Sequence, residues 1–309
     1  MLLSDRPPVL GTRGSPLAMA QARMAARALE TAHGWEPGTV EIRPFKTTGD
    51  KIQDRPLAEV GGKGLWTKEL DQYLLNGDTD FSVHSMKDVE SVRPPELNIA
   101  AMLPRADVRD RLIGAPSIAA LSQGARVGTS SPRRAAQLLR MRPDLQVESI
   151  RGNVATRLAK VERGEVDATL LAAAGLDRLG IKAGHAVEPG VMLPAPAQAA
   201  IGCECRTDDT ALRELLSAIN DGGTCAAVAA ERALSRALGG SCHSPVAALA
   251  LQEGDGRIWL RAEILSTDGA EQVAGEVRFT PEQGEEAAEA LARELLDRAP
   301  QSVRQLFAA

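Results

Sequence analysis

The sequence predicts an α/β protein built from two lobes and a small C-terminal α+β domain. Short apolar runs alternate with helical stretches through most of the first two-thirds of the 309 residues, which is typical of strands with helices packed against them. Two similar Gly-Thr-Ser segments, about 117 residues apart, suggest one in each lobe. The chain is also longer than one hydrophobic core normally serves.

The ends of the helices carry the clearest local signals. Ser15 and Ser131 are preferred N-cap residues, and each precedes a proline, which the first helical position tolerates. Asn153 is a third cap, while Gly34 and Pro143 are helix stops. The predicted helices span 17–29, 132–141, 154–163, 225–238 and 285–295, and the predicted strands span 8–11, 80–85, 125–128, 147–150, 168–172, 246–251 and 258–265.

Proline-rich passages at 93–95 and 193–196 are candidate crossings between the lobes. We predict a first lobe from residues 1–104 and 195–216, a second lobe from 105–194, and a C-terminal domain from 217–309.

Composition excludes several classes of protein. Aromatic residues make up 3% of the chain and the net charge is -5, so we expect no nucleic-acid partner. No apolar run approaches the roughly 18 residues of a membrane-spanning helix, and the start MLLSDRPPVL lacks the apolar region of a secretory signal. Four cysteines in so long a chain do not make a disulfide scaffold, so we expect a cytoplasmic protein.

The segments GTRGSP (11–16) and GTSSP (128–132) each lie where a strand passes into a helix. Free backbone N–H groups and the positive helix end collect there, which makes an anion site. Two ordinary helix caps are the alternative for either copy alone. The pair favours two lobes that present anion sites across a cleft.

Arginine is concentrated between residues 126 and 163, where eight arginines occur. Four of them, Arg133, Arg134, Arg151 and Arg157, fall at strand ends or in first helical turns, where ligands bind in α/β proteins. Arginine suits bidentate contact with carboxylate or phosphate. A solvated basic helix face is the alternative, and a ligand with several negative groups is favoured.

The segment VHSMKDVE ends a predicted strand and places Lys87 and Asp88 on the loop after it. A carboxylate beside an ammonium stays ionised and can stabilise a cation or handle a proton. The dipeptide alone is weak evidence, because such pairs are common on surfaces. We interpret His84 as a packed or hydrogen-bonded strand residue.

Cys242 follows Gly239, Gly240 and Ser241, and this turn makes its thiol accessible as a nucleophile or attachment point. A metal site from the cysteines and His243 is conceivable, but Cys-x-Cys is not the usual paired spacing and we predict no metal.

Taken together, these segments resemble the porphobilinogen deaminase (hydroxymethylbilane synthase) family. The matching motifs are GTRGSPLAMAQ, KTTGD, GGKGLWTKEL, DFSVHSMKD, GTSSPRRAAQL, SIRGNVATRL, LAAAGLDRLG, AAERALSRALGGSCHSPVAA and, more weakly, LPAPAQAAIGCECR. They run in the family's order from Gly11 to Ala248.

The resemblance implies an enzyme that joins four porphobilinogen units head to tail into hydroxymethylbilane and releases ammonia. It implies two lobes like those of periplasmic binding proteins, two chain crossings, and a third domain that carries a dipyrromethane cofactor on a thioether. A monomer with a small-molecule substrate is expected, without a membrane or nucleic-acid partner.

The family's motif positions carry over residue by residue. The motif aspartate is Asp88, and the attachment cysteine is Cys242. The resemblance assigns cofactor binding to Lys87, Thr129, Ser130, Ser131, Arg133, Arg134, Arg151 and Ser241, and substrate binding to Arg13, Ser15, Lys63, Arg157, Arg178 and Gln198. One departure is PAPAQAA, where Ala197 and Ala199 flank Gln198 in place of the usual small-residue and glycine setting.

A non-catalytic anion-binding module is the alternative from a different class, since the arginines suit both. Asp88 and Cys242 favour the enzyme, because a binding module needs neither a carboxylate among cations nor a turn-exposed thiol.

Overall fold

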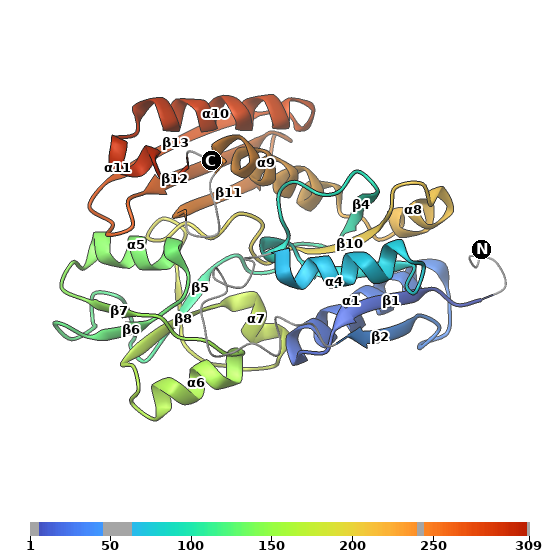
Figure 1. The fold of residues 1–309 in the computed structure, drawn as a ribbon, viewed down its shortest axis with the longest axis horizontal. Helices are drawn as coiled ribbons and strands as arrows, with labels where there is room; N and C mark the ends of the chain where they lie inside the picture. Colours follow the sequence, from blue (N-terminus) through green and yellow to red (C-terminus); the bar gives the residue numbers. More distant parts are fainter. Residues whose placement is uncertain (1–5, 46–63, 240–243, 308–309) are drawn as a thin grey trace. The chain divides into compact units, whose positions relative to one another are not determined.

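The computed structural model describes residues 6–45, 64–239 and 244–307. The chain forms two compact units, the first from Met1–Ala106 and Ala199–Cys225 and the second from Asp107–Gln198 and Ala226–Ala309. The chain therefore leaves the first unit, returns to it, and leaves it again. Figure 1 labels the elements named below.

The first unit contains a five-stranded sheet of order β2-β1-β3-β10-β4. Strand β1 pairs in parallel with β2 and β3, whereas β10 runs antiparallel between β3 and β4. The strands are β1 (Val9–Arg13), β2 (Glu41–Phe45), β3 (Phe81–Ser85), β4 (Leu97–Met102) and β10 (Ile201–Arg206). The helices are α1 (Pro16–His33), α4 (Gly64–Leu75) and α8 (Thr210–Ser217), and the 3-10 turn η1 (Met86–Asp88) follows β3.

Helix α1 shows how the local sequence determines an element. The Ser15 side chain accepts a hydrogen bond from the Ala18 N–H at 3.3 Å, and Gly34 ends the helix with a φ of 64°. Its buried face includes Ala22, Ala25 and Leu29 at helical spacing, and packs against strands of the sheet.

The second unit repeats this strand pattern in a sheet of order β7-β6-β8-β5-β9. Strand β6 pairs in parallel with β7 and β8, and β5 runs antiparallel between β8 and β9. The strands are β5 (Asp110–Ile113), β6 (Arg126–Gly128), β7 (Gln146–Glu148), β8 (Ala168–Ala172) and β9 (His185–Val187). The helices that follow β6, β7 and β8 are α5 (Pro132–Met141), α6 (Val154–Glu162) and α7 (Ala173–Arg178).

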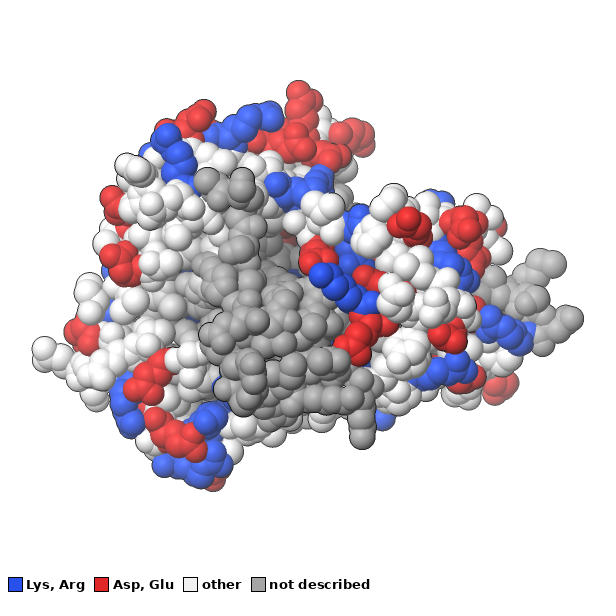
Figure 2. Space-filling view, viewed as in Figure 1, with Lys and Arg blue, Asp and Glu red and all other residues white. Residues whose placement is uncertain are grey.

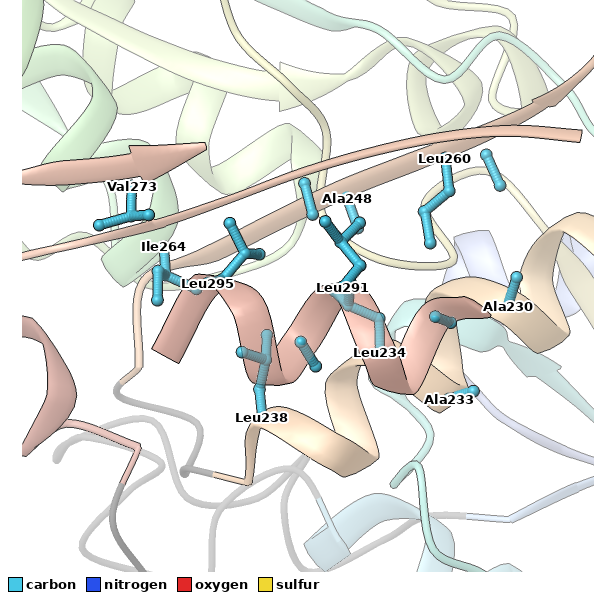
Figure 3. Packing of buried hydrophobic residues seen from close by; sticks show 14 of the residues in the cluster. Ala230, Ala233, Leu234, Leu238, Ala248, Leu260, Ile264, Val273, Leu291 and Leu295 are labelled. Carbon is cyan, nitrogen blue, oxygen red and sulfur yellow. The ribbon is translucent and has the colours of Figure 1, made fainter. Parts of the chain in front are cut away.

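The C-terminal part is a three-stranded antiparallel sheet, β11-β12-β13, with helices packed on one face. In Figure 3, Leu234 and Leu238 of α9 and Leu291 and Leu295 of α10 meet alanine and leucine side chains of the sheet. Small and aliphatic residues therefore build this core. The elements are β11 (Val246–Gln252), β12 (Ile258–Leu265), β13 (Gln272–Phe279), α9 (Gly222–Leu238), η2 (Pro281–Gln283), α10 (Gly284–Arg298) and α11 (Gln301–Arg304).

The predicted fold class of two α/β lobes with two crossings and a smaller C-terminal sheet domain is confirmed. The three predicted domain boundaries stay predictions. Every predicted helix and strand has a counterpart, although α9 begins three residues before the predicted start and β7 lies at Gln146–Glu148 instead of 147–150. Strands β2, β4, β5, β9, β10 and β13 and helices α4, α7, α8 and α11 were not predicted. No helix among the described residues has the length and apolar character needed to cross a membrane.

On the face drawn in Figure 2, basic and acidic side chains are intermixed over the described surface. Many form exposed ion pairs, such as Arg126 with Asp167 and Arg298 with Glu294. Exposed pairs contribute about 0–1 kcal/mol each to stability. The buried charges described next are therefore the informative ones.

Candidate functional site

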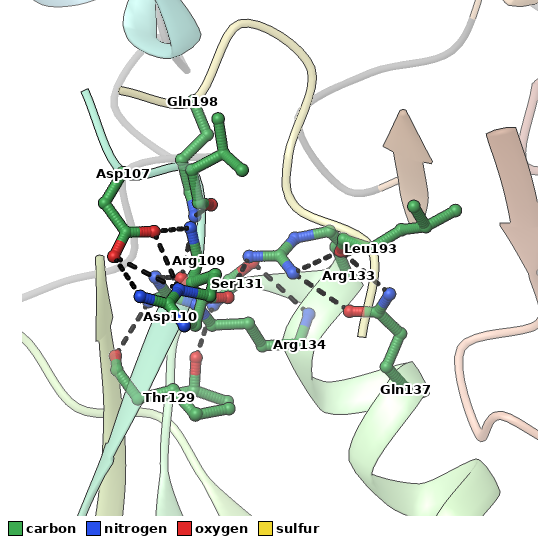
Figure 4. Close-up of polar contacts among 12 residues, drawn as sticks. Asp107, Arg109, Asp110, Thr129, Ser131, Arg133, Arg134, Gln137, Leu193 and Gln198 are labelled. Carbon is green, nitrogen blue, oxygen red and sulfur yellow. Dashed lines mark hydrogen bonds and ion pairs between the residues drawn. The ribbon is translucent and has the colours of Figure 1, made fainter. Parts of the chain in front are cut away.

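A cluster of buried charges lies at one end of strand β5 in the second unit. Arg133 Nη2 donates to Asp110 Oδ2 at 2.7 Å, and Arg134 donates to both Asp110 oxygens, from Nε at 3.2 Å and from Nη2 at 2.6 Å. Figure 4 shows the two guanidinium groups around this carboxylate. The exposed fractions are 3% for Asp110, 4% for Arg133 and 6% for Arg134.

The position of this cluster follows from the topology. Asp110 pairs with Ala172, the last residue of the parallel strand β8, so it lies at the carboxyl-terminal edge of the sheet. Arg133 and Arg134 lie in the first turn of α5, which follows β6 at the same edge. Ligands of open α/β sheets bind at this edge.

The electrostatics of the cluster are set by burial and by close opposite charges. Burial favours the neutral carboxyl, but the charges and hydrogen bonds of Arg134 and Arg133 outweigh it and hold the pKa of Asp110 well below its usual range. Burial lowers the pKa of the Arg133 guanidinium. A second buried carboxylate, Glu263, acts on Arg133 through Gln137, so two carboxylates face the two guanidinium groups.

Gln198 joins the same cluster and is fully buried. Its Nε2 donates to Asp110 Oδ1 at 2.9 Å and to the Val108 carbonyl at 2.8 Å. The flanking Ala197 and Ala199 have φ values of 61° and 72°, a left-handed conformation that glycine adopts without strain. The two alanines at which the sequence departs from the family pattern therefore lie in a strained turn. The turn still brings Gln198 into hydrogen-bond contact with Asp110.

The hydroxyl residues before α5 are used mainly by the backbone. Ser131 caps α5 by accepting from the Arg134 N–H at 3.4 Å, and Thr129 Oγ1 accepts from the Ser131 N–H at 3.1 Å. Ser130 is exposed and donates to the Ile150 carbonyl. Ser131 therefore acts as an ordinary helix cap, which is the alternative considered from the sequence. Anion binding by Thr129, Ser130 and Ser131 stays a prediction.

Three further predicted arginines lie in the second unit. Arg151 is half-buried and precedes the Asn153 cap of α6, and Arg157 Nε donates to the Gly152 carbonyl at 3.0 Å. Arg178 ends α7, where burial lowers the pKa of its guanidinium to about 10.

In the first unit, Lys87 and Asp88 lie on η1 and both are half-buried. Among the described residues, the Asp88 carboxylate forms no hydrogen bond or ion pair. Arg13 ends β1 and Ser15 caps α1, so both lie at the carboxyl-terminal edge of this sheet. The acidic group and its basic neighbours thus occupy an edge equivalent to that of the second unit.

Three predicted site residues, Lys63, Ser241 and Cys242, lie outside the described residues. The other three cysteines are free, and burial raises the pKa of the Cys203 thiol to about 12 and that of the Cys205 thiol to about 11. Thiols with such pKa values are poor nucleophiles at neutral pH. Among the described residues, no group of histidine, cysteine and acidic side chains could hold a metal ion.

His84 is a buried strand residue, as predicted, and it belongs to a network that the sequence did not reveal. Its Nε2 lies 3.0 Å from Glu204 Oε2, and Arg93 bridges Glu204 at 2.8 Å and Asp71 at 2.6 Å. Although burial opposes it, hydrogen bonding and charge from His84 and Arg93 lower the pKa of Glu204 to about 2. Burial raises the pKa of Asp71 despite its contact with Arg93.

Two acidic residues of the C-terminal part were also missed. Glu231 of α9 is fully buried and accepts from the Ala197 N–H at 2.6 Å and the Ala250 N–H at 2.7 Å. Glu263 of β12 accepts from Gln137, which in turn accepts from Arg133. A sequence signal for Glu231 exists, because its spacing from Leu234 and Leu238 places it on the apolar face of α9.

The described residues fit a ligand with several carboxylates. Two buried guanidinium groups, three hydroxyl groups and a capped helix N-terminus lie at one sheet edge. Arg133 Nε is buried and finds no hydrogen-bond partner among the described residues. An orphaned cationic donor near a helix N-terminus is a setting in which a carboxylate binds well.

Comparisons with known proteins point the same way. Residues 9–214 match the family model "Porphobilinogen deaminase, dipyromethane cofactor binding domain", and residues 225–297 match "Porphobilinogen deaminase, C-terminal domain". A porphobilinogen deaminase of Sphingopyxis alaskensis is 57% identical over 98% of both chains, and one of Paracoccus denitrificans is 50% identical over 94% of both.

Likeness to solved structures is weaker. The second substrate binding domain of an amino acid transporter from Streptococcus pneumoniae aligns with a TM-score of 0.42 at 10% identity, covering 69% of this chain and 90% of that one. This similarity is too low to support an argument about this chain.

Proposed function

The chain belongs to the porphobilinogen deaminase family, whose model describes a dipyrromethane cofactor binding domain, and we propose that it condenses four porphobilinogen units head to tail into hydroxymethylbilane. Ammonia leaves at each step, which makes the enzyme a transferase of tetrapyrrole and haem biosynthesis. The buried pair Arg133 and Arg134 at the N-terminus of α5, where Arg133 Nε has no hydrogen-bond partner among the described residues, is the observation that supports this best.

Carboxylate recognition is the first task of these residues. Each pyrrole unit carries an acetate and a propionate, so the growing chain gains two carboxylates per step. Guanidinium groups and helix N-termini bind such groups strongly. Cofactor binding is proposed for Lys87, Thr129, Ser130, Ser131, Arg133, Arg134, Arg151 and Ser241, and substrate binding for Arg13, Ser15, Lys63, Arg157, Arg178 and Gln198.

The dipyrromethane supplies a covalently held pyrrole to which the first substrate is joined. We propose that the thiol of Cys242 attaches it through a thioether, since Cys203 and Cys205 are buried and have raised pKa values. Cys242→Ser should give folded protein without the cofactor, because a hydroxyl is the poorer nucleophile. Intact mass measures this, and a variant that kept the mass of two pyrrole units would disprove the assignment.

Asp88 is proposed as the catalytic carboxylate. When ammonia leaves porphobilinogen, the carbon–nitrogen bond breaks and positive charge spreads onto the pyrrole nitrogen. A fixed carboxylate beside that N–H stabilises the charge as it develops. The half-buried Asp88 on η1 has no competing partner among the described residues, which suits this role.

The test of this role is single-turnover ammonia release, with covalent species followed by intact mass. Asp88→Asn and Asp88→Ala should slow release about 100- to 1000-fold. Asp88→Glu keeps the charge and should retain measurable activity, stalling with pyrrole units bound. Release by Asp88→Asn at near the wild-type rate would show that the carboxylate has no electrostatic role.

The proposed binding role of the arginines can be tested with a matched control, because Arg151 and Arg140 lie in the same stretch of sequence. Arg151→Leu should impair cofactor assembly or elongation, because it leaves ligand carboxylates unpaired at a cost of roughly 2–5 kcal/mol. Arg140 is exposed on α5, and Arg140→Leu should have little effect. Equal losses of activity in both variants would contradict the assignment.

We further propose a monomeric cytoplasmic enzyme with porphobilinogen as its small-molecule partner, without nucleic acid or membrane. Three free cysteines among the described residues suit a reducing compartment. Sedimentation of the purified protein at working concentration tests the monomer directly.

A further inference from the structure

Strand β10 carries a glycine against the first residue of the turn that holds Asp88. A Cβ atom at Gly202 would lie 2.2 Å from Met86 Sδ, 3.1 Å from Met86 Cγ and 3.3 Å from Ile99 Cγ2. Ordinary contacts between such atoms are about 3.5–4.0 Å. The backbone of Gly202 is not left-handed, so glycine is needed here for the space that a side chain would take and not for its backbone conformation.

The contact matters because Met86 anchors η1. Its side chain is 1% exposed, and its N–H donates to the Ala200 carbonyl at 3.0 Å. At the other end, the buried Val89 donates to the Met86 carbonyl at 3.2 Å. Two buried anchors therefore flank Lys87 and Asp88, and the place of Met86 fixes where the turn begins.

The strand before the turn is held independently of this contact. Ser85 pairs with Ile201 of β10, and its hydroxyl accepts from Gln21 of α1 at 3.2 Å. His84 is fixed by Glu204 at 3.0 Å. Because β3 is held up to Ser85, a displacement of Met86 is absorbed by the turn and not by the strand.

We propose that Gly202 is a positioning residue for Asp88, because its bare backbone receives the Met86 side chain and thereby sets the position of η1. This rests on the catalytic role proposed for Asp88. With Ile99 closing the other side, an added methyl group forces Met86 out and moves the turn. A misplacement of about 1 Å in a reacting group can reduce a rate about 100-fold.

The experiment compares Gly202→Ala with Gly222→Ala in the full-length holoenzyme. Gly222 is exposed and is not left-handed, and no atom of the described residues would lie within 4 Å of an added Cβ, so its variant should match the wild type. Gly202→Ala should keep the cofactor mass and bind porphobilinogen with a KM within about threefold of wild type. Its single-turnover ammonia release should fall about 10- to 100-fold. A wild-type rate would overturn the proposal.

Combination with Asp88→Asn separates positioning from general damage. If Gly202 acts through Asp88, then Gly202→Ala slows the wild type but adds no further loss to Asp88→Asn. Losses that multiply would overturn the positioning role while leaving the role of Asp88 intact. A wild-type rate for Asp88→Asn alone would overturn the role of Asp88, and this proposal with it.

A second-site variant covers the case in which Gly202→Ala folds poorly. Met86→Ala removes the Cγ and Sδ atoms that the new methyl group would meet. The double variant Gly202→Ala with Met86→Ala should be more stable and release ammonia faster than Gly202→Ala alone. If neither the stability nor the rate of ammonia release recovered in the double variant, the contact with Met86 would not be the cause of the loss, and the proposal would be wrong.

Discussion

The two lobe sheets share one strand pattern but use their buried charges in opposite ways. Each places an antiparallel strand, β10 or β5, beside three parallel strands, and each such strand carries a buried carboxylate. In the first unit, the cation Arg93 serves two buried acids, Glu204 and Asp71. In the second unit, the acid Asp110 serves two cations.

Position along the strand differs as well. Glu204 pairs with Ser82, inside β3, whereas Asp110 pairs with Ala172 at the end of β8. The first network therefore lies within the sheet and the second at its carboxyl-terminal edge, next to a helix N-terminus. The same topology thus places the buried charges inside the sheet in one lobe and at the edge where α/β proteins bind ligands in the other.

The largest expected effect is that of Asp110→Asn. It leaves two buried guanidinium groups with no carboxylate and should destabilise the protein by about 3–5 kcal/mol at pH 7. The folded pKa of Asp110 lies below its usual value, so its pairing stabilises above about pH 4, and this stabilisation is lost as the pH falls further. Urea unfolding at pH 7 and below pH 4 should show the deficit shrinking with acid.

Asp177→Asn is the control for that measurement, because Asp177 pairs with Arg111 at an exposed site. It should cost less than about 1 kcal/mol at either pH. A deficit for Asp110→Asn that stayed constant with pH would contradict the depressed pKa.

Glu204→Gln should have a smaller effect, about 2–3 kcal/mol at pH 7, because Arg93 keeps Asp71 as a partner at 2.6 Å. The pKa of Glu204 is lowered to about 2, so its stabilisation is present above roughly pH 4.5 and is lost as the pH falls toward 2. The same unfolding measurements apply. A cost larger than that of Asp110→Asn would reverse the proposed contrast between the networks.

The N-caps of α1 and α5 are a feature for which the two lobes should behave alike. Ser15 and Ser131 cap α1 and α5 through hydrogen bonds of 3.3 and 3.4 Å. Ser15→Ala and Ser131→Ala should each cost about 0.5–1 kcal/mol in unfolding free energy. Only unequal costs would indicate that one serine does more than cap its helix.

The smallest effects are expected at the alanines of the second crossing. Ala197→Gly relieves a left-handed conformation worth about 1–2 kcal/mol but loses a buried methyl group and adds unfolded-state entropy. The net change should be within about 0.5 kcal/mol, and Ala199→Gly should match it. Ala200 is fully buried with an ordinary φ, so Ala200→Gly should cost about 1–2 kcal/mol in thermal unfolding.

Sequence patterns predicted the elements that depend on local signals. The caps at Ser15, Ser131 and Asn153 and the stop at Gly34 are local chemistry, and each was found where predicted. Strand β10 was missed because IGCECR places a buried Glu204 in an apolar run, and only Arg93 and His84 from elsewhere make that burial possible. Strand β5 was missed for the same reason, since Asp110 needs partners from α5.

Individual residues of the candidate site could be predicted from the sequence, but the contacts between them could not. The arginines at the start of α5 and the acidic turn after β3 were identified from sequence as chemistry-bearing residues. That Asp110 and Gln198 gather around Arg133 and Arg134 depends on contacts between residues 23–88 positions apart. Periodicity and spacing carry no information on such contacts.

The central place of β10 also fixes an order of assembly during translation. Among the described strands, β4 joins the first sheet only through β10, so this sheet cannot be completed before residue 206 has left the ribosome. The second lobe sheet needs only strands between residues 110 and 187, all of which are synthesised earlier. The nascent chain therefore exposes an unpaired edge of β3 while later residues emerge, and such edges favour intermolecular association. We therefore expect chains that stop near residue 190 to contain every strand of the second sheet but an incomplete, aggregation-prone first sheet.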